Sequence, residues 1–195
     1  MDHDAPDDVI ADPLAHLGAG DPVMRRLAVS ACAPLLAAHE DVVAAVAELL
    51  RADPQPRVRA EAAEVLGAAP GTVGLLLAAA GDPDPVVREA VATALGEKGD
   101  RAAVPWLLEA AAGDDRMLQE AAVAALGAIG DPVAIPLLVE LAASGSPQVR
   151  RRAVVSLSAF DRDDAEAAIT RAAGDRNPMV REVAEMILGR VATSE

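Results

Sequence analysis

Aromatic residues are nearly absent from this chain of 195 residues. They make up 1% of it, as Trp106 and Phe160, and there is no tyrosine. Alanine is abundant instead, with 46 residues, so any core must consist of small side chains that pack closely. The single cysteine, Cys32, excludes an internal disulfide and a cysteine-based metal cluster. It is typical of a reducing compartment, so we expect a cytoplasmic protein.

Positive charge is scarce as well. Lys and Arg number 17 against 31 Asp and Glu, and the formal net charge is −14. Binding to nucleic acid or to an anionic membrane surface requires a cationic field, so we expect neither partner. The acidic start MDHDAPDD lacks the features of a signal peptide, and no apolar run has the length of a membrane span. With 52% hydrophobic residues, the chain is nevertheless able to bury a core.

A segment of 13 residues recurs along the chain, as in DPVVREAVATALG from Asp84 and DRMLQEAAVAALG from Asp115. Its fifth position is arginine in five of six copies, and Gln119 is the exception. Successive copies lie 34, 29, 31, 31 and 31 residues apart. The five repeat arginines are Arg25, Arg59, Arg88, Arg150 and Arg181. A fixed period of this length predicts a repeat architecture.

Each copy has the signals of a helix. Most copies begin with Asp, Ser or Asn, which accept hydrogen bonds at helix N-termini, and proline usually follows at the first helical position. Apolar residues then recur at helical spacing, and glycine ends many copies, where we expect C-caps at Gly67, Gly96, Gly127 and Gly189.

A second amphipathic stretch lies between successive copies, for example Val42–Leu50 and Val133–Ala142. The unit is therefore a helix, a turn and a second helix, and no segment alternates as a strand would. A two-helix unit cannot bury its apolar face alone, so neighbouring units must stack. We expect one domain over residues 1–195, with residues 1–6 as a frayed acidic terminus and residues 7–190 as the array.

The pattern D-P-x-V-R-x-x-A-x-x-A-L-G, followed by G-D and A-V-P-x-L-L, resembles the short HEAT-like repeats of the phycobilisome-lyase type. The resemblance implies an all-α fold, a right-handed α-solenoid of about six two-helix repeats. It also implies that the repeat arginines bond acidic or carbonyl groups of neighbouring turns, that the first helices form the convex layer and that the second helices line the concave layer. It says little about activity, because such repeats serve as adaptors, scaffolds and lyase subunits.

We predict a partner-binding strip on the concave layer, at positions one, four and five residues after the repeat arginine. The strip is mostly small and apolar with charged borders. Its residues are Val29, Ala63, Ala92, Thr93, Val123, Val154, Val155, Arg151, Glu89 and Glu120. An alternative remains open, that these small residues only reflect a tightly curved superhelix with little open groove.

Trp106 is the one tryptophan, in the variable position of A-V-P-x-L-L, and is a candidate hot spot for binding. A half-buried position between repeats is the alternative. We find no catalytic constellation, no metal-ligand spacing and no glycine-rich phosphate loop, so we predict no cofactor. The sequence therefore predicts a non-catalytic module or scaffold for a protein or peptide partner. The alternative is an enzyme or a lyase-like or chaperone-like subunit with a small-molecule pocket on the concave face. Neither the partner nor the oligomeric state follows from the sequence.

Overall fold

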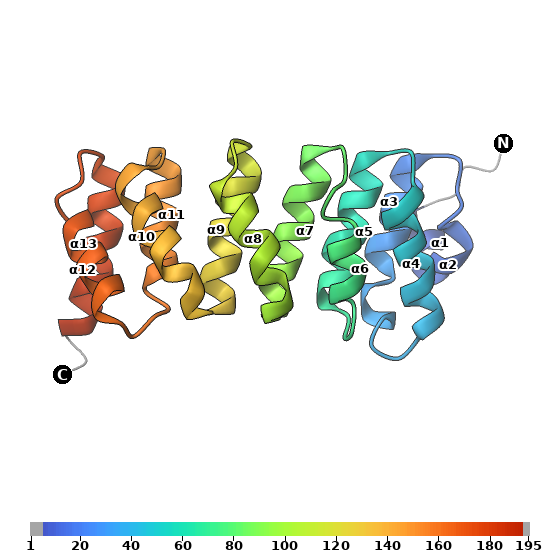
Figure 1. Cartoon of the computed structure of the whole chain (residues 1–195). Coiled ribbons are helices and arrows are strands. Elements are labelled where there is room, and N and C mark those ends of the chain that lie inside the picture. The colour runs from blue at the N-terminus through green and yellow to red at the C-terminus, as the bar shows by residue number, and fades with distance from the viewer. Residues whose placement is uncertain (1–5, 193–195) are drawn as a thin grey trace. The chain divides into compact units, whose positions relative to one another are not determined.

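The computed structural model describes residues 6–192, and within that range every regular element is a helix. The prediction of an all-α fold is confirmed. The helices follow one another in pairs along the chain, and we call the two members of each pair the first helix and the second helix (Figure 1). Of the six residues that we expected to fray, residues 1–5 lie outside the described residues.

The second helices coincide with the recurring segment. They are α3 (Pro22–Ala31), α5 (Pro56–Ala68), α7 (Pro85–Lys98), α9 (Arg116–Ile129), α11 (Pro147–Leu157) and α13 (Pro178–Ala192).

The first helices are more variable, and several begin with a 3-10 turn. They are α1 (Pro6–Ala11) with α2 (Pro13–His16), η1 (Ala33–Leu35) with α4 (Glu40–Ala52), α6 (Val73–Ala78), η2 (Arg101–Ala103) with α8 (Val104–Ala112), η3 (Pro132–Ala134) with α10 (Ile135–Ser144), and α12 (Asp163–Ala172). Pro13 divides the first of them, because it follows the N-cap Asp12 and starts a new helix.

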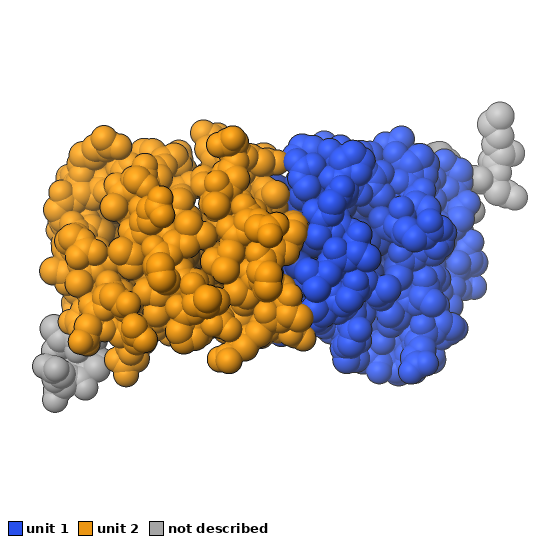
Figure 2. Space-filling model, in the orientation of Figure 1, with its two compact units in different colours: residues 1–98 blue, residues 99–195 orange. Residues whose placement is uncertain are grey.

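The contacts divide the chain into two compact units, residues 1–98 (unit 1) and residues 99–195 (unit 2), coloured separately in Figure 2. Unit 1 contains the helices from α1 to α7 and unit 2 the helices from η2 to α13. Each unit is described by itself below. In the part of the chain that the structure describes, no helix is both long enough and apolar enough to cross a membrane.

The expected helix starts are confirmed. The carboxylates of Asp21 and Asp84 accept hydrogen bonds from the backbone N–H groups of Val23 and Val86, at 2.9 and 3.0 Å. Gln55, which lacks the short side chain of a good N-cap, makes no such bond. These caps satisfy N–H groups that a helix cannot pair internally, so each second helix begins at a defined residue.

The expected glycine C-caps are wrong. Gly67, Gly96, Gly127 and Gly189 all lie inside their helices, and none of them has a positive φ. The left-handed turn after α9 is formed instead by Gly130, with φ of 68°.

Gly67 and Gly127 have a different role, which is close packing of neighbouring second helices. A Cβ atom on Gly127 of α9 would lie 2.6 Å from the Cβ atom of Ser156 on α11. On Gly67 of α5 it would lie 3.0 Å from the Cβ atom of Ala94 on α7. The hydroxyl of Ser156 is buried at this contact and donates to the carbonyl of Val123 at 2.8 Å. Glycine recurs here because it lets adjacent helices approach each other.

The repeat arginines connect each repeat to the next. Arg25 donates two hydrogen bonds to the carboxylate of Asp53, from Nε at 2.7 Å and Nη2 at 2.9 Å. Arg59 binds Asp82 at the same two distances, and its Nη1 also donates to the carbonyl of Asp53 at 2.8 Å. Bidentate pairs of this kind fix both distance and angle. Each loop aspartate therefore holds two successive repeats in register.

In unit 2, a loop aspartate is bound by two successive repeat arginines in the same way. Arg150 donates to both carboxylate oxygens of Asp175 at 2.7 Å, and Arg181 donates to the carbonyl of Asp175 at 2.8 Å. Gln119, which replaces the arginine, donates to the carbonyl of Ala111 at 2.9 Å. The predicted structural role of the repeat arginines is confirmed at these positions.

Candidate protein-interaction surface

The repeat arginine sets the register of the faces of each second helix. Residues three and seven positions after it are buried in the interior repeats, as Ala62 and Leu66 are in α5. A residue four positions after the arginine lies about 60° around the helix from the buried position seven, because each residue turns the helix by about 100°. A residue five positions after it lies further around the helix and reaches solvent.

Half of the predicted strip is therefore wrong. The side chains four residues after the arginine form a buried column, in which every member is 0% exposed. These are Val29, Ala63, Ala92, Val123 and Val154. Because they are fully buried, these side chains are not available to a partner. In the last repeat the same position is Glu185 of α13, which is exposed.

The side chains one and five residues after the arginine do reach the surface in most repeats. Each unit has an exposed column five residues after the arginine position. It consists of Ser30, Glu64 and Thr93 in unit 1, and of Val155 and Met186 beside the half-buried Ala124 in unit 2. Of the predicted strip, Thr93, Val155 and Arg151 are exposed, and Glu89 and Glu120 are half-buried.

In unit 1 this face is acidic and polar. Glu64 of α5 lies near Glu61 on its own helix and near Glu89 and Glu97 on α7. Partial burial, followed by the repulsion of these three carboxylates, raises the pKa of Glu64 above its ordinary value. Arg26 of α3 lies 3.9 Å from Glu61 and offsets part of the repulsion.

In unit 2 the corresponding face is largely apolar. Val155 is 40% exposed and Met186 49% exposed, and Ala124 precedes them in the same column. Met117 and Met179 add further exposed apolar surface near the starts of α9 and α13, at 54% and 51%. Methionine side chains are flexible and polarizable, so such a surface adapts to partners of different shape.

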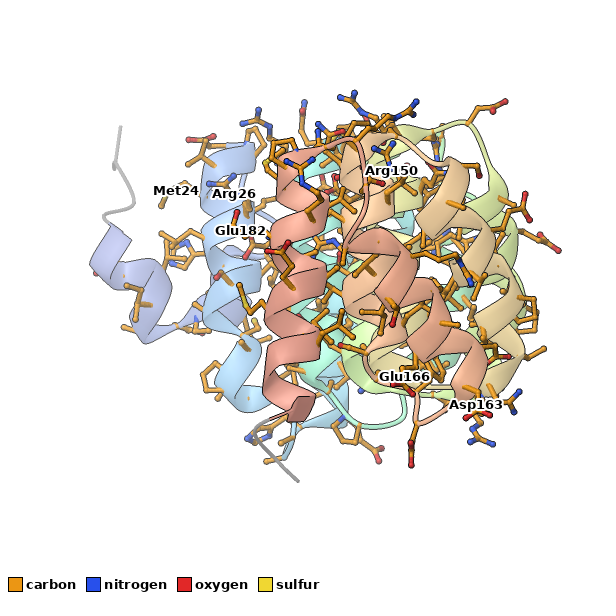
Figure 3. All side chains as sticks on the ribbon, turned by 90° about the vertical axis from the view of Figure 1, so that its left-hand side faces the viewer. Met24, Arg26, Arg150, Asp163, Glu166 and Glu182 are labelled. Carbon is orange, nitrogen blue, oxygen red and sulfur yellow. The ribbon has the colours of Figure 1, made fainter. Side chains whose placement is uncertain are left out.

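Charged residues border this apolar column in alternating order. One residue after each arginine position, α9 has Glu120, α11 has Arg151 and α13 has Glu182. Arg151 forms no ion pair with any residue that the structure describes in unit 2. Figure 3 shows Glu182 projecting from α13 on the side away from α12, whereas Asp163 and Glu166 belong to α12.

Trp106 lies elsewhere. It is half-buried on α8, which is a first helix, so it does not join the exposed column. Met117 and Met179 were not among the predicted residues. Their signal was present in the sequence, because both stand two residues before the repeat arginine position, where Val23 and Val86 are exposed as well.

Reactive groups are dispersed among the described residues. Cys32 is buried at the end of α3, and burial raises the pKa of its thiol, which disfavours the reactive thiolate. His39 is exposed just before α4. Residues 6–192 contain no group of three or more His, Cys, Asp or Glu side chains that could hold a metal ion.

Comparisons with known proteins agree with the helical-repeat fold. A family model described as HEAT repeats matches residues 72–156. This part of the chain, residues 72–156, is similar to HEAT repeats. The match includes every helix from α6 to α10 and most of α11, and therefore parts of both units. No protein of curated function matches the sequence.

Solved structures resemble nearly the whole chain in fold. A phycocyanin lyase chain from Nostoc sp. PCC7120, in the complex of CpcE and CpcF, is 24% identical with a TM-score of 0.68, over 95% of this chain and 76% of that one. An engineered protein is 18% identical with a TM-score of 0.65, over 94% and 98%. A chain from a study of microtubule plus-end tracking by XMAP215, CLIP-170 and EB1 is 15% identical with a TM-score of 0.56, over 92% and 89%. At these identities the likeness shows the fold and leaves the activity open.

Proposed function

We propose that the protein is a non-catalytic protein-binding module, in which the second-helix face of unit 2 binds an apolar segment of a protein partner. The observation that carries this proposal is the exposure of Val155 and Met186, which lie five residues after the repeat arginine position and continue from the half-buried Ala124. The same column is polar in unit 1. An apolar surface in water is costly unless a partner covers it.

The charges beside the column specify the kind of partner. Glu120, Arg151 and Glu182 present negative, positive and negative charge at successive repeats. A partner helix with an apolar stripe and charges of the opposite order would bind in one direction only. The helices are already ordered, so binding costs little conformational entropy in this protein.

Two further considerations support a binding role. The net charge of −14 disfavours nucleic acid as the partner. The phycocyanin lyase chain with the same fold was solved in a complex of two proteins, which accords with a protein partner here. We also propose that residues 7–190 act as one repeat array.

Affinity capture from native lysate tests the proposal with two matched variants. Val155→Glu places a charge in the apolar column of unit 2, and Val133→Glu places the same charge on η3, where Val133 is 58% exposed. We expect the wild type and Val133→Glu to retain the same protein, and Val155→Glu to lose it by at least tenfold at equal thermal stability. Equal retention by all three proteins would overturn the assignment to this face.

A further inference from the structure

A groove on the opposite layer of unit 1 is unrelated to the proposed binding face. It has a volume of about 570 Å³ and lies between the first helices α4 and α6. Its apolar walls comprise Ala44, Ala47 and Leu50 on one side and Leu75, Ala78 and Ala79 on the other. Leu75 is 40% exposed, so the wall faces solvent.

The repeats provide an internal comparison for this groove. A related groove of about 190 Å³ lies between the first helices α10 and α12 of unit 2. Each groove ends at a loop aspartate held by a repeat arginine, Asp82 in unit 1 and Asp175 in unit 2. Four residues before the aspartate stands Ala78 in the first groove and Arg171 in the second. The larger groove therefore has a small residue where the smaller one has a long side chain.

The charges at the rim of the larger groove are already paired. Glu48 forms an ion pair with Arg51 on the same helix, and Asp82 forms one with Arg59 at 2.7 Å. A charged ligand would have to compete with one of these pairs, whereas a neutral ligand leaves both intact. The volume lies within the range of about 300–1,000 Å³ that is typical of small-molecule sites, which are mostly apolar with few polar groups.

We propose that the groove between α4 and α6 binds a neutral, predominantly apolar small molecule. The inference is independent of the proposed protein-binding face, because it concerns the first helices of unit 1. Access to the groove depends on the small side chain of Ala78, because the corresponding residue of the smaller groove is Arg171.

Titration with the neutral dye Nile red, followed by fluorescence, tests the proposal. We expect saturable binding to the wild type at one site. Ala78→Arg copies the residue found in the smaller groove, so it should fill the site without disturbing the fold and weaken binding at least tenfold. Arg171→Ala should leave this site intact and add a second, weaker one. Circular dichroism checks that the variants remain folded.

Two controls separate this site from other apolar surfaces. Val155→Glu, on the second-helix face of unit 2, should leave Nile red binding unchanged. Decanol should displace the dye, and decanoate should require at least a tenfold higher concentration. No saturable binding, equal binding by Ala78→Arg, loss with Val155→Glu, or equal displacement by decanoate would each overturn the proposal.

Discussion

Five residues after the repeat arginine, unit 1 has Ser30, Glu64 and Thr93, whereas unit 2 has Ala124, Val155 and Met186. One residue earlier the difference disappears in every repeat but the last, because both units bury small apolar side chains there and only α13 has the exposed Glu185. Stacking of two-helix repeats requires the buried column and leaves the exposed one unconstrained. Where the residues of the exposed column are apolar instead of polar, repeat packing does not explain them, whereas the proposed protein partner would.

The buried column should be intolerant of charge, and this is the largest effect that we predict. Val154→Glu would bury a carboxylate without a counterion in unit 2, because Val154 is 0% exposed. We expect a loss of more than about 4 kcal/mol of the free energy of unfolding, or failure to fold. Urea denaturation followed by circular dichroism measures it.

The adjacent residue provides a matched control. Val155 is 40% exposed, so Val155→Glu should change the free energy of unfolding by about 0.5 kcal/mol or less. If both variants fold equally well, the distinction between the two columns is wrong, and with it the comparison of the two units.

Val154 and Val155 also show how much of the structure could be predicted from the sequence. The arginine register and the capping residues predicted the helix pairs, because both depend on local chemistry that recurs in every repeat. The same register assigned Val154 and Val155 together to the surface. Burial changes within one residue along a helix and depends on how neighbouring repeats pack, which the sequence of one repeat does not contain.

The groove beside Ala78 could not be predicted for a related reason. It depends on the space between α4 and α6, which belong to successive repeats. The sequence does show that this repeat is short, because the 29 residues from Arg59 to Arg88 are the shortest spacing between successive copies. That spacing corresponds to the short helix α6, but the volume follows only from the three-dimensional arrangement.

Close helix packing should differ in strength between the two units. A Cβ atom at Gly127 would lie 2.6 Å from Ser156, but at Gly67 it would lie 3.0 Å from Ala94. We expect Gly127→Ala to lower the free energy of unfolding by about 1–3 kcal/mol, as overpacking does. Gly67→Ala should be nearly neutral, because the higher helix propensity of alanine, worth about 1 kcal/mol, offsets the closer contact.

Replacing the obstructing side chain checks the cause. Ser156→Gly in the Gly127→Ala background should recover part of the loss, measured by thermal or urea denaturation. Equal costs at Gly67 and Gly127, or no recovery in the double variant, would show that helix approach is not tighter in unit 2.

The smallest predicted effect concerns the acidic face of unit 1. The raised pKa of Glu64 means that the folded state disfavours its charged form. Glu64 therefore lowers stability above the pKa of an unfolded glutamate, about 4.3, and has no effect where both states are protonated. Because the side chain is exposed, screening reduces the effect, and we expect Glu64→Gln to raise the free energy of unfolding by about 0.5 kcal/mol at pH 7.

The pH dependence of the stability gained by Glu64→Gln distinguishes charge repulsion from other causes of that gain. Burial raises the pKa of Asp53, but the hydrogen bonds from Arg25 and the backbone N–H of Gln55, together with the charges of Arg25 and Arg59, outweigh it and hold the pKa below its ordinary value. The contribution of Asp53 to stability is therefore lost as pH falls. The gain from Glu64→Gln should instead be largest at pH 7 and vanish as the pH approaches about 3.5. It should also shrink in high salt, where the repulsion from Glu61, Glu89 and Glu97 is screened. A gain that is independent of both pH and salt would indicate that the clustered carboxylates do not repel, and that the two exposed faces differ less in electrostatics than their residues suggest.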